Sequence, residues 1–455
     1  MNFENLFILD LANNHQGDVS HAIRIIDSMD NLCIDNDPVI SIKLQLRDLD
    51  TFIHPDYKSS RMAERFLSTR LELEEFAEIA QHIKQSGFIL SVTPFDEISV
   101  KHAVDGLKTD FLKVASCSAT DWSLMEAVAE TELPVVVSTG GLSIEDVDKV
   151  VSFCEHRDLN FALHHCVSIY PTNPDQMNLW RIQEFKRRYP GLTIGWSTHE
   201  EPNFYNAITA AYALGARLFE RHIGMATERY PLNTYSSESK AIKEWLIAWS
   251  IAVDMLKEKD ISNIEQENLI PFKRGYYDGK RMIPFNGEPE KPYSDVLELK
   301  HAIHQIKAML NYANIALPEE FELEFSHHKG IKNFRRIGTT MIEICNRHYA
   351  KKLLIMLPGQ SHPSHHHKIK DETFQVLYGE LQVTIDGYDQ KLKAGELATV
   401  KSGIWHSFSS ENGCIFEEIS TTSIPGDSVY GEPIDENRKT KVKNWGRYEL
   451  ENKLK

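Results

Sequence analysis

Two groups of side chains in this sequence have the types and the spacing that metal-assisted chemistry needs. In the first group, His199 and His222 each follow a short apolar run, and Glu220 lies two residues before His222. Two imidazoles can share a divalent ion that keeps open positions, and such an ion acts as a Lewis acid on a carbonyl oxygen. Residues two apart in a strand face the same way, so Glu220 is a candidate general base beside that ion.

The second group lies near the end of the chain and consists of His365, His367, Glu372 and His406. His365 and His367 share one face of any strand, so two imidazoles and a carboxylate can meet one metal, with His406 as a fourth ligand. Three successive histidines alone are typical of a solvated polar run. Together with Glu372, His406 and the glycines around them, they indicate a second metal site that would accept Mn²⁺, Zn²⁺, Fe²⁺ or a similar ion.

Lysines and hydroxyl side chains accompany the first group. Lys43 and Lys113 would act as compact point charges, and Ser and Thr hydroxyls would complete an oxygen shell around a small, doubly charged anion such as a phosphate ester. The hydroxyl candidates are Thr93, Ser116, Ser138, Ser168 and Ser197. The residues therefore predict a metal-assisted enzyme that acts on a phosphorylated substrate and a carbonyl.

Eight short apolar runs, which alternate with amphipathic stretches of helical length, must position these side chains. The runs cover residues 6–12, 38–45, 88–95, 111–116, 134–140, 160–166, 192–198 and 218–224. Continuously apolar runs are typical of parallel strands that are covered on both faces. Eight strand–helix units predict a (β/α)8 TIM barrel over residues 1–258, with a doubly wound open sheet as the alternative. The polar candidates lie at the carboxyl ends of the runs, where the active site of such a barrel is found.

The rest of the chain has a different pattern. Residues 259–325 are predicted to form a linker or helical arm, with a Pro- and Gly-rich stretch over 283–295 and one amphipathic helix over 297–313. From residue 326 to 455, short alternating runs are separated by tight turns, which predicts a small antiparallel β-barrel. The fold class is therefore α/β, followed by an all-β domain.

Composition excludes several classes of partner. The 455 residues carry a formal net charge of −16, which argues against general nucleic-acid binding. No apolar run approaches the ~20 residues of a membrane span, and the first residues have no basic flank before a signal-like core. The six cysteines form no CxxC pair. We therefore expect a reduced, soluble, cytoplasmic protein without a nucleic-acid or membrane partner.

Ordered motifs in the barrel region resemble the sialic acid synthase family, which condenses phosphoenolpyruvate with an N-acyl hexosamine to make nonulosonic acids. The resemblance covers residues 6–257. The motifs are LDLANNHQGD (9–18), Lys43-Leu44-Gln45, SVTPFD (91–96), KVAS (113–116), STGG (138–141), HCVSIYP (165–171), STHE (197–200) and ERH (220–222).

The resemblance implies a role for each candidate. Lys43, Lys113 and the five hydroxyl residues would hold phosphoenolpyruvate, while His199 and His222 would bind Mn²⁺ or Mg²⁺, which polarises the open-chain sugar aldehyde. The methylene carbon of phosphoenolpyruvate would then attack that aldehyde, water would add to the resulting cation, and phosphate would leave with C–O cleavage. The resemblance also assigns proton transfer to Glu220, a catalytic carboxylate to Asp10, and sugar contacts to Gln45, Tyr170 and Asn233.

Three departures from the family pattern lie on the sugar side. Asp10 stands where the family usually has Glu, Ser118 stands where it has Glu, and Asn233 stands where an Asp grips the sugar. Hydrogen-bonding groups set sugar specificity strongly, so we expect an acceptor other than N-acetylmannosamine. Many relatives also carry an antifreeze-like domain that completes the partner subunit's site, and residues 259–325 show no match to it. A symmetric homodimer is the natural expectation.

The second metal group resembles the two cupin motifs, with Lys401 where the second motif usually has Pro. The wider sequence is similar to D-lyxose ketol-isomerase cupins, in which a metal binds adjacent sugar oxygens, so the cupin is expected to bind or isomerise sugar. Whether Glu418 faces the cavity or solvent stays open from the sequence. Two alternatives also stay open: a metal-dependent aldolase or isomerase that does not use phosphoenolpyruvate, and a non-catalytic cupin for sugar sensing or dimerisation.

Overall fold

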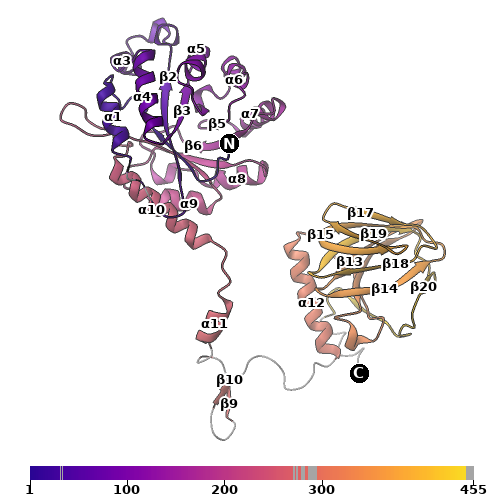
Figure 1. Cartoon of the computed structure of the whole chain (residues 1–455). Coiled ribbons are helices and arrows are strands. Elements are labelled where there is room, and N and C mark those ends of the chain that lie inside the picture. Colours follow the sequence, from indigo (N-terminus) through magenta and orange to yellow (C-terminus); the bar gives the residue numbers. More distant parts are fainter. Residues whose placement is uncertain are drawn as a thin grey trace. The chain divides into compact units, whose positions relative to one another are not determined.

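The structure is a computed structural model that describes residues 1–30, 32, 34–269, 272, 275–277, 282–284 and 295–446. It divides into two compact units, Met1–Ser262 and Asn263–Lys455 (Figure 1). Among the described residues, none of the helices has both the length and the apolar character that a bilayer crossing requires.

The N-terminal unit is a closed barrel of eight parallel strands that follow one another in chain order. The last strand closes on the first, with Leu218 opposite Leu6 and His222 opposite Asp10. The predicted (β/α)8 barrel is therefore confirmed, and the open-sheet alternative is wrong. The strands are β1 (Leu6–Asp10), β2 (Val39–Leu46), β3 (Ile89–Pro94), β4 (Phe111–Val114), β5 (Val135–Ser138), β6 (Phe161–Cys166), β7 (Ile194–Thr198) and β8 (Leu218–His222).

Helices surround this barrel and bury the outer faces of its strands (Figure 1). Phe7 of β1 packs against Trp245 and Trp249 of the last barrel helix, with ring centroids 5.4 and 4.9 Å apart. Gly87 follows α4 with a φ of +80°, in the left-handed region where a helix commonly stops at glycine. The helices are α1 (Val19–Asp27), α2 (Leu49–Phe52), α3 (Arg61–Ser68), α4 (Leu73–Gln85), α5 (Glu97–Lys101), α6 (Trp122–Ala129), α7 (Ile144–His156), α8 (Trp180–Arg188), α9 (Asn206–Ala213) and α10 (Ser239–Leu256).

The C-terminal unit is an antiparallel β half-barrel, which confirms the predicted all-β domain. Its strands run in the order β20-β14-β18-β15-β19-β13-β12-β11-β21, and β16 and β17 also pair with β15. The long β15 joins the two parts of the sheet because it pairs with both β18 and β19. The strands are β11 (Glu322–Ser326), β12 (Thr339–Asn346), β13 (Tyr349–Met356), β14 (Gln360–His367), β15 (Glu372–Ile385), β16 (Tyr388–Lys393), β17 (Leu397–Val400), β18 (His406–Ser410), β19 (Cys414–Thr421), β20 (Ser428–Tyr430) and β21 (Lys439–Lys443).

The amphipathic helix expected over 297–313 is α12 (Asp295–Tyr312), and it packs into the core of the C-terminal unit. Its Leu299 and Ile306 lie in one buried cluster with Leu323 and Ile355 of the sheet. Before it come α11 (Ser262–Leu269) and a short antiparallel pair, β9 (Gly275–Tyr277) and β10 (Met282–Pro284). Most of the predicted Pro- and Gly-rich stretch, residues 285–294, lies outside the described residues.

Candidate functional sites

A cavity of about 1050 Å³ lies at the carboxyl ends of the barrel strands. It brings together every barrel residue to which the sequence gave a role, because parallel strands of a barrel all end at the same rim. Ser118, which stands where the family has Glu, is not among the lining residues. The roles given to these residues remain predictions. The singled-out lining residues are Asp10, Lys43, Gln45, Thr93, Lys113, Ser116, Ser138, Ser168, Tyr170, Ser197, His199, Glu220, His222 and Asn233.

A buried lysine between two carboxylates forms the floor of this cavity. The Nζ atom of Lys43 lies 2.6 Å from Glu220 Oε1 and 3.1 Å from Asp10 Oδ2. Burial alone would lower the pKa of Lys43, but the carboxylates of Asp10 and Glu220 outweigh it and raise the pKa. Lys113 lies 3.7 Å from Glu220, and burial lowers its pKa. Lys43 is therefore held as a fixed ammonium, whereas Lys113 is the weaker base.

Glu220 has a third neighbour, His164, which the sequence analysis did not single out. Its Nδ1 lies 3.4 Å from Glu220 Oε2, and burial lowers the pKa of His164 to about 4. Burial would also raise the pKa of Glu220, but Lys113, Lys43 and His164 together hold that pKa well below its usual value. Glu220 is thus an ionised carboxylate in the absence of substrate, and its neighbours would have to move or exchange charge before it could hold a proton.

Hydroxyl groups line the cavity beside Lys113. The Lys113 ammonium donates to Ser138 Oγ at 2.6 Å, and the Gly140 backbone N–H donates to Ser116 Oγ at 2.9 Å. A Cβ atom at Gly140 would lie 2.7 Å from Ser168 Oγ and 2.8 Å from Ser116 Oγ. The absence of a side chain at Gly140 therefore lets these hydroxyls gather in one shell, as anion binding requires.

His199 and His222 lie together, with ring centroids 5.3 Å apart. Nδ1 of His199 lies 2.9 Å from the Val167 carbonyl oxygen, and donation to that carbonyl leaves Nε2 as a free lone pair. Burial, with a smaller contribution from His222, lowers the pKa of His199 to about 3, and burial also lowers the pKa of His222. Both imidazoles are therefore neutral, which is the form that binds a metal, so these residues fit a divalent ion.

A chain of polar contacts leads from this centre to Arg47, another residue that the sequence analysis missed. Gln45 donates from Nε2 to Asp10 Oδ2 at 2.8 Å, and its Oε1 accepts from Arg47 at 2.9 Å. The Arg47 guanidinium lies 3.6 Å from the Phe95 ring centroid and 4.3 Å from that of Phe66. Arg47 therefore fixes which end of the Gln45 amide faces Asp10.

Two of the residues expected to contact the sugar, Tyr170 and Asn233, already contact other side chains or backbone groups. Tyr170 lies over His199 with ring centroids 4.3 Å apart, and Tyr235, which the sequence analysis missed, lies 5.2 Å from Tyr170. Asn233 is occupied by its own loop, because its Oδ1 accepts from the backbone N–H groups of Tyr235 and Ser236 at 3.2 and 2.9 Å. Its side chain therefore shapes the loop that carries Tyr235.

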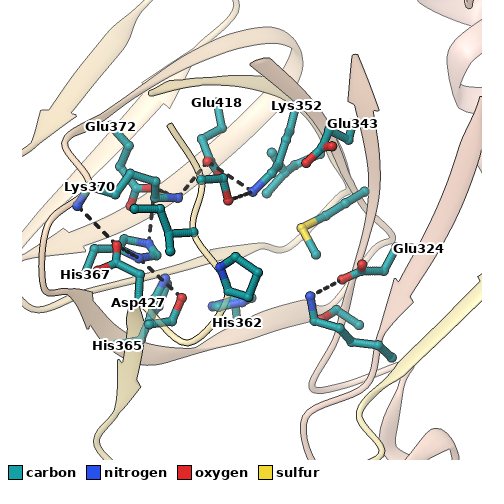
Figure 2. Close-up of a pocket in the computed structure, with 18 of the residues that line it drawn as sticks. Glu324, Glu343, Lys352, His362, His365, His367, Lys370, Glu372, Glu418 and Asp427 are labelled. Atoms are coloured by element: carbon teal, nitrogen blue, oxygen red, sulfur yellow. Dashed lines mark hydrogen bonds and ion pairs between the residues drawn. The ribbon is translucent and has the colours of Figure 1, made fainter. Parts of the chain in front are cut away.

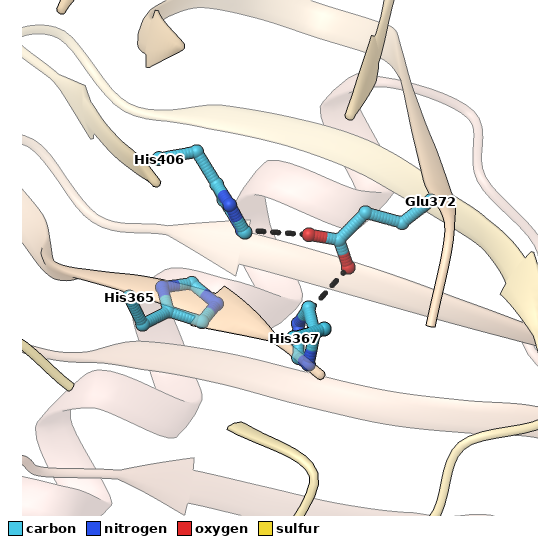
Figure 3. A group of neighbouring side chains, drawn as sticks. All are labelled: His365, His367, Glu372 and His406. Atoms are coloured by element: carbon cyan, nitrogen blue, oxygen red, sulfur yellow. Dashed lines mark ion pairs between the residues drawn. The ribbon is translucent and has the colours of Figure 1, made fainter. Parts of the chain in front are cut away.

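The predicted metal group of the C-terminal unit is also brought together (Figure 3). One ligand atom each from His365, His367, Glu372 and His406 can be chosen so that all lie within 4.8 Å of one another. Glu372 lies 2.6 Å from His406 Nε2 and 3.4 Å from His367 Nε2. The four buried side chains therefore have the donor set and the spacing of a site for a divalent ion.

Contacts to the other ring nitrogens orient these histidines. Nδ1 of His365 lies 3.2 Å from the Pro363 carbonyl, Nδ1 of His406 lies 3.1 Å from the Ile404 carbonyl, and Nδ1 of His367 lies 3.3 Å from Ser428 Oγ. Such outer contacts fix the tautomer and leave Nε2 for the metal.

A second buried lysine between two carboxylates lies beside this group (Figure 2). Lys370 Nζ is 2.6 Å from Glu372 Oε2 and 2.7 Å from Glu418 Oε1. Burial would lower the pKa of Lys370, but Glu418 and Glu372 outweigh it and raise the pKa. Glu418, whose direction the sequence left open, is buried and lines a cavity of about 430 Å³ together with His365, His367 and Glu372.

Fold and sites together define a class of protein: a TIM barrel with a charged rim, followed by a cupin with a His/Glu cluster. Residues 39–255 match the NeuB family, and residues 352–414 match the cupin domain. The chain belongs to the NeuB family through its barrel and carries a cupin domain after it.

Named relatives share the barrel part. The N-acetylneuraminate-9-phosphate synthase of Mus musculus is 27% identical over 221 residues, 48% of this chain and 61% of its own length. The pseudaminic acid synthase of Campylobacter jejuni is 27% identical over 230 residues, 47% of this chain and 64% of its own length. The solved structure of a candidate spore coat polysaccharide biosynthesis protein E from Chromobacterium violaceum is 40% identical with a TM-score of 0.57, over 59% of this chain and 82% of that one. The chain thus spans less than two thirds of the two synthases.

Proposed function

We propose that the barrel condenses phosphoenolpyruvate with an N-acyl hexosamine-type aldose, giving a nonulosonic acid and phosphate. The observation that carries this proposal is the single cavity in which Lys113, a shell of hydroxyls and the His199–His222 pair face one another. The names of the relatives agree with it, since two of them are synthases of nonulosonic acids. The shell of hydroxyls beside Lys113 disfavours a metal-dependent aldolase or isomerase that acts on uncharged substrates, which would need no anion site.

In this proposal each group has a limited task. His199 and His222 would hold Mn²⁺ or Mg²⁺, which supplies Lewis acidity toward the sugar aldehyde. Lys113 and the hydroxyls of Ser116 and Ser138 would orient phosphoenolpyruvate and stabilise the phosphate as it leaves. Glu220, which its neighbours keep ionised, would accept a proton from the water that attacks the substrate once substrate binding draws Lys43 or Lys113 away from it.

Phosphate release tests the barrel proposal directly. The full chain with Mn²⁺, phosphoenolpyruvate and a panel of N-acyl hexosamines is expected to release inorganic phosphate with at least one sugar. The variant His199→Ala should abolish that release, whereas His156→Ala, at the end of α7, should leave it unchanged. Absence of release across the panel, or equal rates in His199→Ala and the unchanged chain, would refute the proposal.

We further propose that the cupin isomerises a sugar, with a divalent ion held by His365, His367, Glu372 and His406. The contacts of Glu418 support an acid–base role. Lys370, Lys352 and Ser420 all approach its Oε1, at 2.7, 3.6 and 3.2 Å, which leaves Oε2 for a substrate proton. Glu418 would move a proton between the two adjacent carbons of an aldose and a ketose, while the ion would hold their oxygens.

Exchange between aldose and ketose, followed by NMR on the full chain, tests this second proposal. Glu418→Gln should lose exchange and keep the metal, His367→Ala should lose both, and Glu417→Gln, one residue away, should lose neither. Exchange that survives His367→Ala would refute metal-assisted isomerisation. A metal-loaded chain without exchange on any aldose of the panel would favour the sugar-sensing or dimerisation module instead, and sedimentation would then test the proposed homodimer.

A further inference from the structure

The two lysines of the barrel cavity do not give it a net positive charge. Lys43 is shared between Asp10 and Glu220, and Lys113 lies 3.7 Å from Glu220, so the two lysines and the two carboxylates cancel one another formally. Charge that is already compensated in this way attracts a further anion weakly. The cavity wall also holds Arg47, Arg61 and Arg65 against Glu64, so its surplus of positive charge comes from arginines.

Arginines on one short helix supply part of that surplus. Arg61 and Arg65 belong to α3 and both line the cavity. They are one helical turn apart, so their side chains leave the same side of the helix. Within the described part of the chain, neither guanidinium makes an ion pair, although Arg65 is half-buried. Glu64, which is exposed, is the acidic residue that α3 contributes to the same wall.

The position of α3 separates these arginines from the hydroxyl shell. The helix follows β2, whereas Ser116, Ser138, Ser168 and Ser197 lie in or directly after β4 to β7. Contacts of α3 place it beside the ends of β1 and β2. Thr69, whose hydroxyl donates to the Arg65 carbonyl at 2.8 Å, accepts from the Asn13 amide after β1 at 2.8 Å, and the Phe66 ring lies 4.3 Å from the Arg47 guanidinium after β2. Arg65 therefore lies on the β1–β2 side of the cavity, near Gln45, which is expected to meet the sugar.

We propose that Arg61 and Arg65 form a subsite for an anionic substituent, a phosphate ester or a carboxylate, on the acceptor sugar. Guanidinium groups suit such groups because their N–H donors match two oxygens at once, and a half-buried arginine without a partner is already partly desolvated. This inference rests on the proposed synthase function, since it names the chemical class of that enzyme's acceptor.

The test compares neutral and anionic forms of the same sugars. With phosphoenolpyruvate and Mn²⁺, kcat/KM is measured for N-acetylhexosamines, their 6-phosphates and the corresponding hexosaminuronates. The unchanged chain is expected to prefer one anionic form at least about tenfold, as for a charge-assisted bond. Arg65→Gln should reduce that preference about tenfold and Arg61→Gln by less, while KM for phosphoenolpyruvate changes less than KM for the acceptor.

Arg70→Gln is the matched control, because it removes a charge from the same segment while Arg70 is already paired with Asp50 at 3.1 Å and Glu72 at 3.0 Å. Its acceptor preference should equal that of the unchanged chain. A preference near one, or a preference that survives Arg65→Gln, would overturn the inference. So would an effect of Arg65→Gln that falls on phosphoenolpyruvate alone.

Direct binding distinguishes this failure from failure of the proposed function. Calorimetric titration with the 6-phosphates and the uronates needs no turnover. Tighter binding of an anionic form than of the neutral sugar, lost in Arg65→Gln, supports the subsite even if no phosphate is released from phosphoenolpyruvate. Equal binding of all forms overturns the subsite even if the synthase is active.

Discussion

Replacement of Lys43 by Met tests the electrostatic core of the barrel site most directly. The change removes the ammonium that lies 2.6 Å from Glu220 and 3.1 Å from Asp10, and it keeps a side chain of similar length. Removal of one partner from a buried ion pair costs about 3–5 kcal/mol, because a charge stays buried without compensation. Lys113 still lies 3.7 Å from Glu220, so we expect about 3 kcal/mol, near the lower end of that range.

The loss should depend on pH. The pKa of Glu220 is depressed in the folded protein, so its contribution to stability is present above its ordinary pKa of 4.5 and is lost as pH falls through the folded value. Without Lys43 that depression shrinks. The difference in unfolding free energy between Lys43→Met and the unchanged chain should therefore be largest at neutral pH and should narrow as the pH falls through the folded-state pKa that Glu220 has in the variant.

Denaturant unfolding followed by tryptophan fluorescence gives the measurement, since Trp196, Trp245 and Trp249 are all buried in the barrel. The double variant Lys43→Met/Glu220→Gln should recover part of the stability, because it removes one stranded carboxylate. Lys149→Met, which removes an exposed lysine, should leave the transition unchanged. A loss below about 1 kcal/mol at pH 7 would refute the assignment of Lys43 as a buried charge bridge.

Three further predictions follow from close contacts. Glu372→Gln should lower the metal affinity of the cupin at least about tenfold, as read by metal content after dialysis; unchanged content would refute the four-ligand site. Gly195→Ala should cost about 1–3 kcal/mol of barrel stability, because its Cβ would lie 2.4 Å from His164 Cδ2, whereas Gly191→Ala, with nothing within 4 Å, should be tolerated. Arg47→Met should raise KM for the acceptor more than KM for phosphoenolpyruvate, with Arg47→Lys intermediate, and equal effects on both would contradict its positioning role.

The sequence predicts the barrel rim well because two simple periodicities control it. Side chains alternate along each strand and all eight strands end at one rim, so Lys43, Lys113 and Glu220 could be brought together without coordinates. His164 was missed because it lies inside β6, before the carboxyl end of the strand, where the polar candidates were expected. A signal for it existed in Gly195, since a glycine inside a neighbouring strand marks a close approach, here by the imidazole of His164.

Other residues could not be predicted in this way. Arg47 and Arg65 lie in the long connection after β2, where no strand period says which side chains turn toward the cavity. Glu418 is a different case, because β19 carries apolar residues on both of its faces, and alternation alone leaves two orientations. Its contact with Lys370 decides between them, and that contact joins strands whose pairing depends on the whole sheet.

Both sites contain a buried lysine between two carboxylates, beside a group of histidines. The net charge of the side chains around the histidines differs between the two sites. In the barrel, Lys43 and Lys113 balance Asp10 and Glu220, and Arg47, Arg61 and Arg65 outnumber Glu64 on the rest of the wall. A divalent ion on the histidines would therefore add its full charge to a cavity that already favours anions. In the cupin, Glu372, Glu418 and Asp427 outnumber Lys370 and Lys352 by one, so the same ion would be half neutralised. An uncharged sugar binds to a metal ion through ion–dipole contacts and does not require a net positive site. A partly neutralised ion can make these contacts and still bind a phosphate ester only weakly. The charge balance therefore agrees with the two proposed functions, an anion site in the barrel and a site for neutral sugar in the cupin.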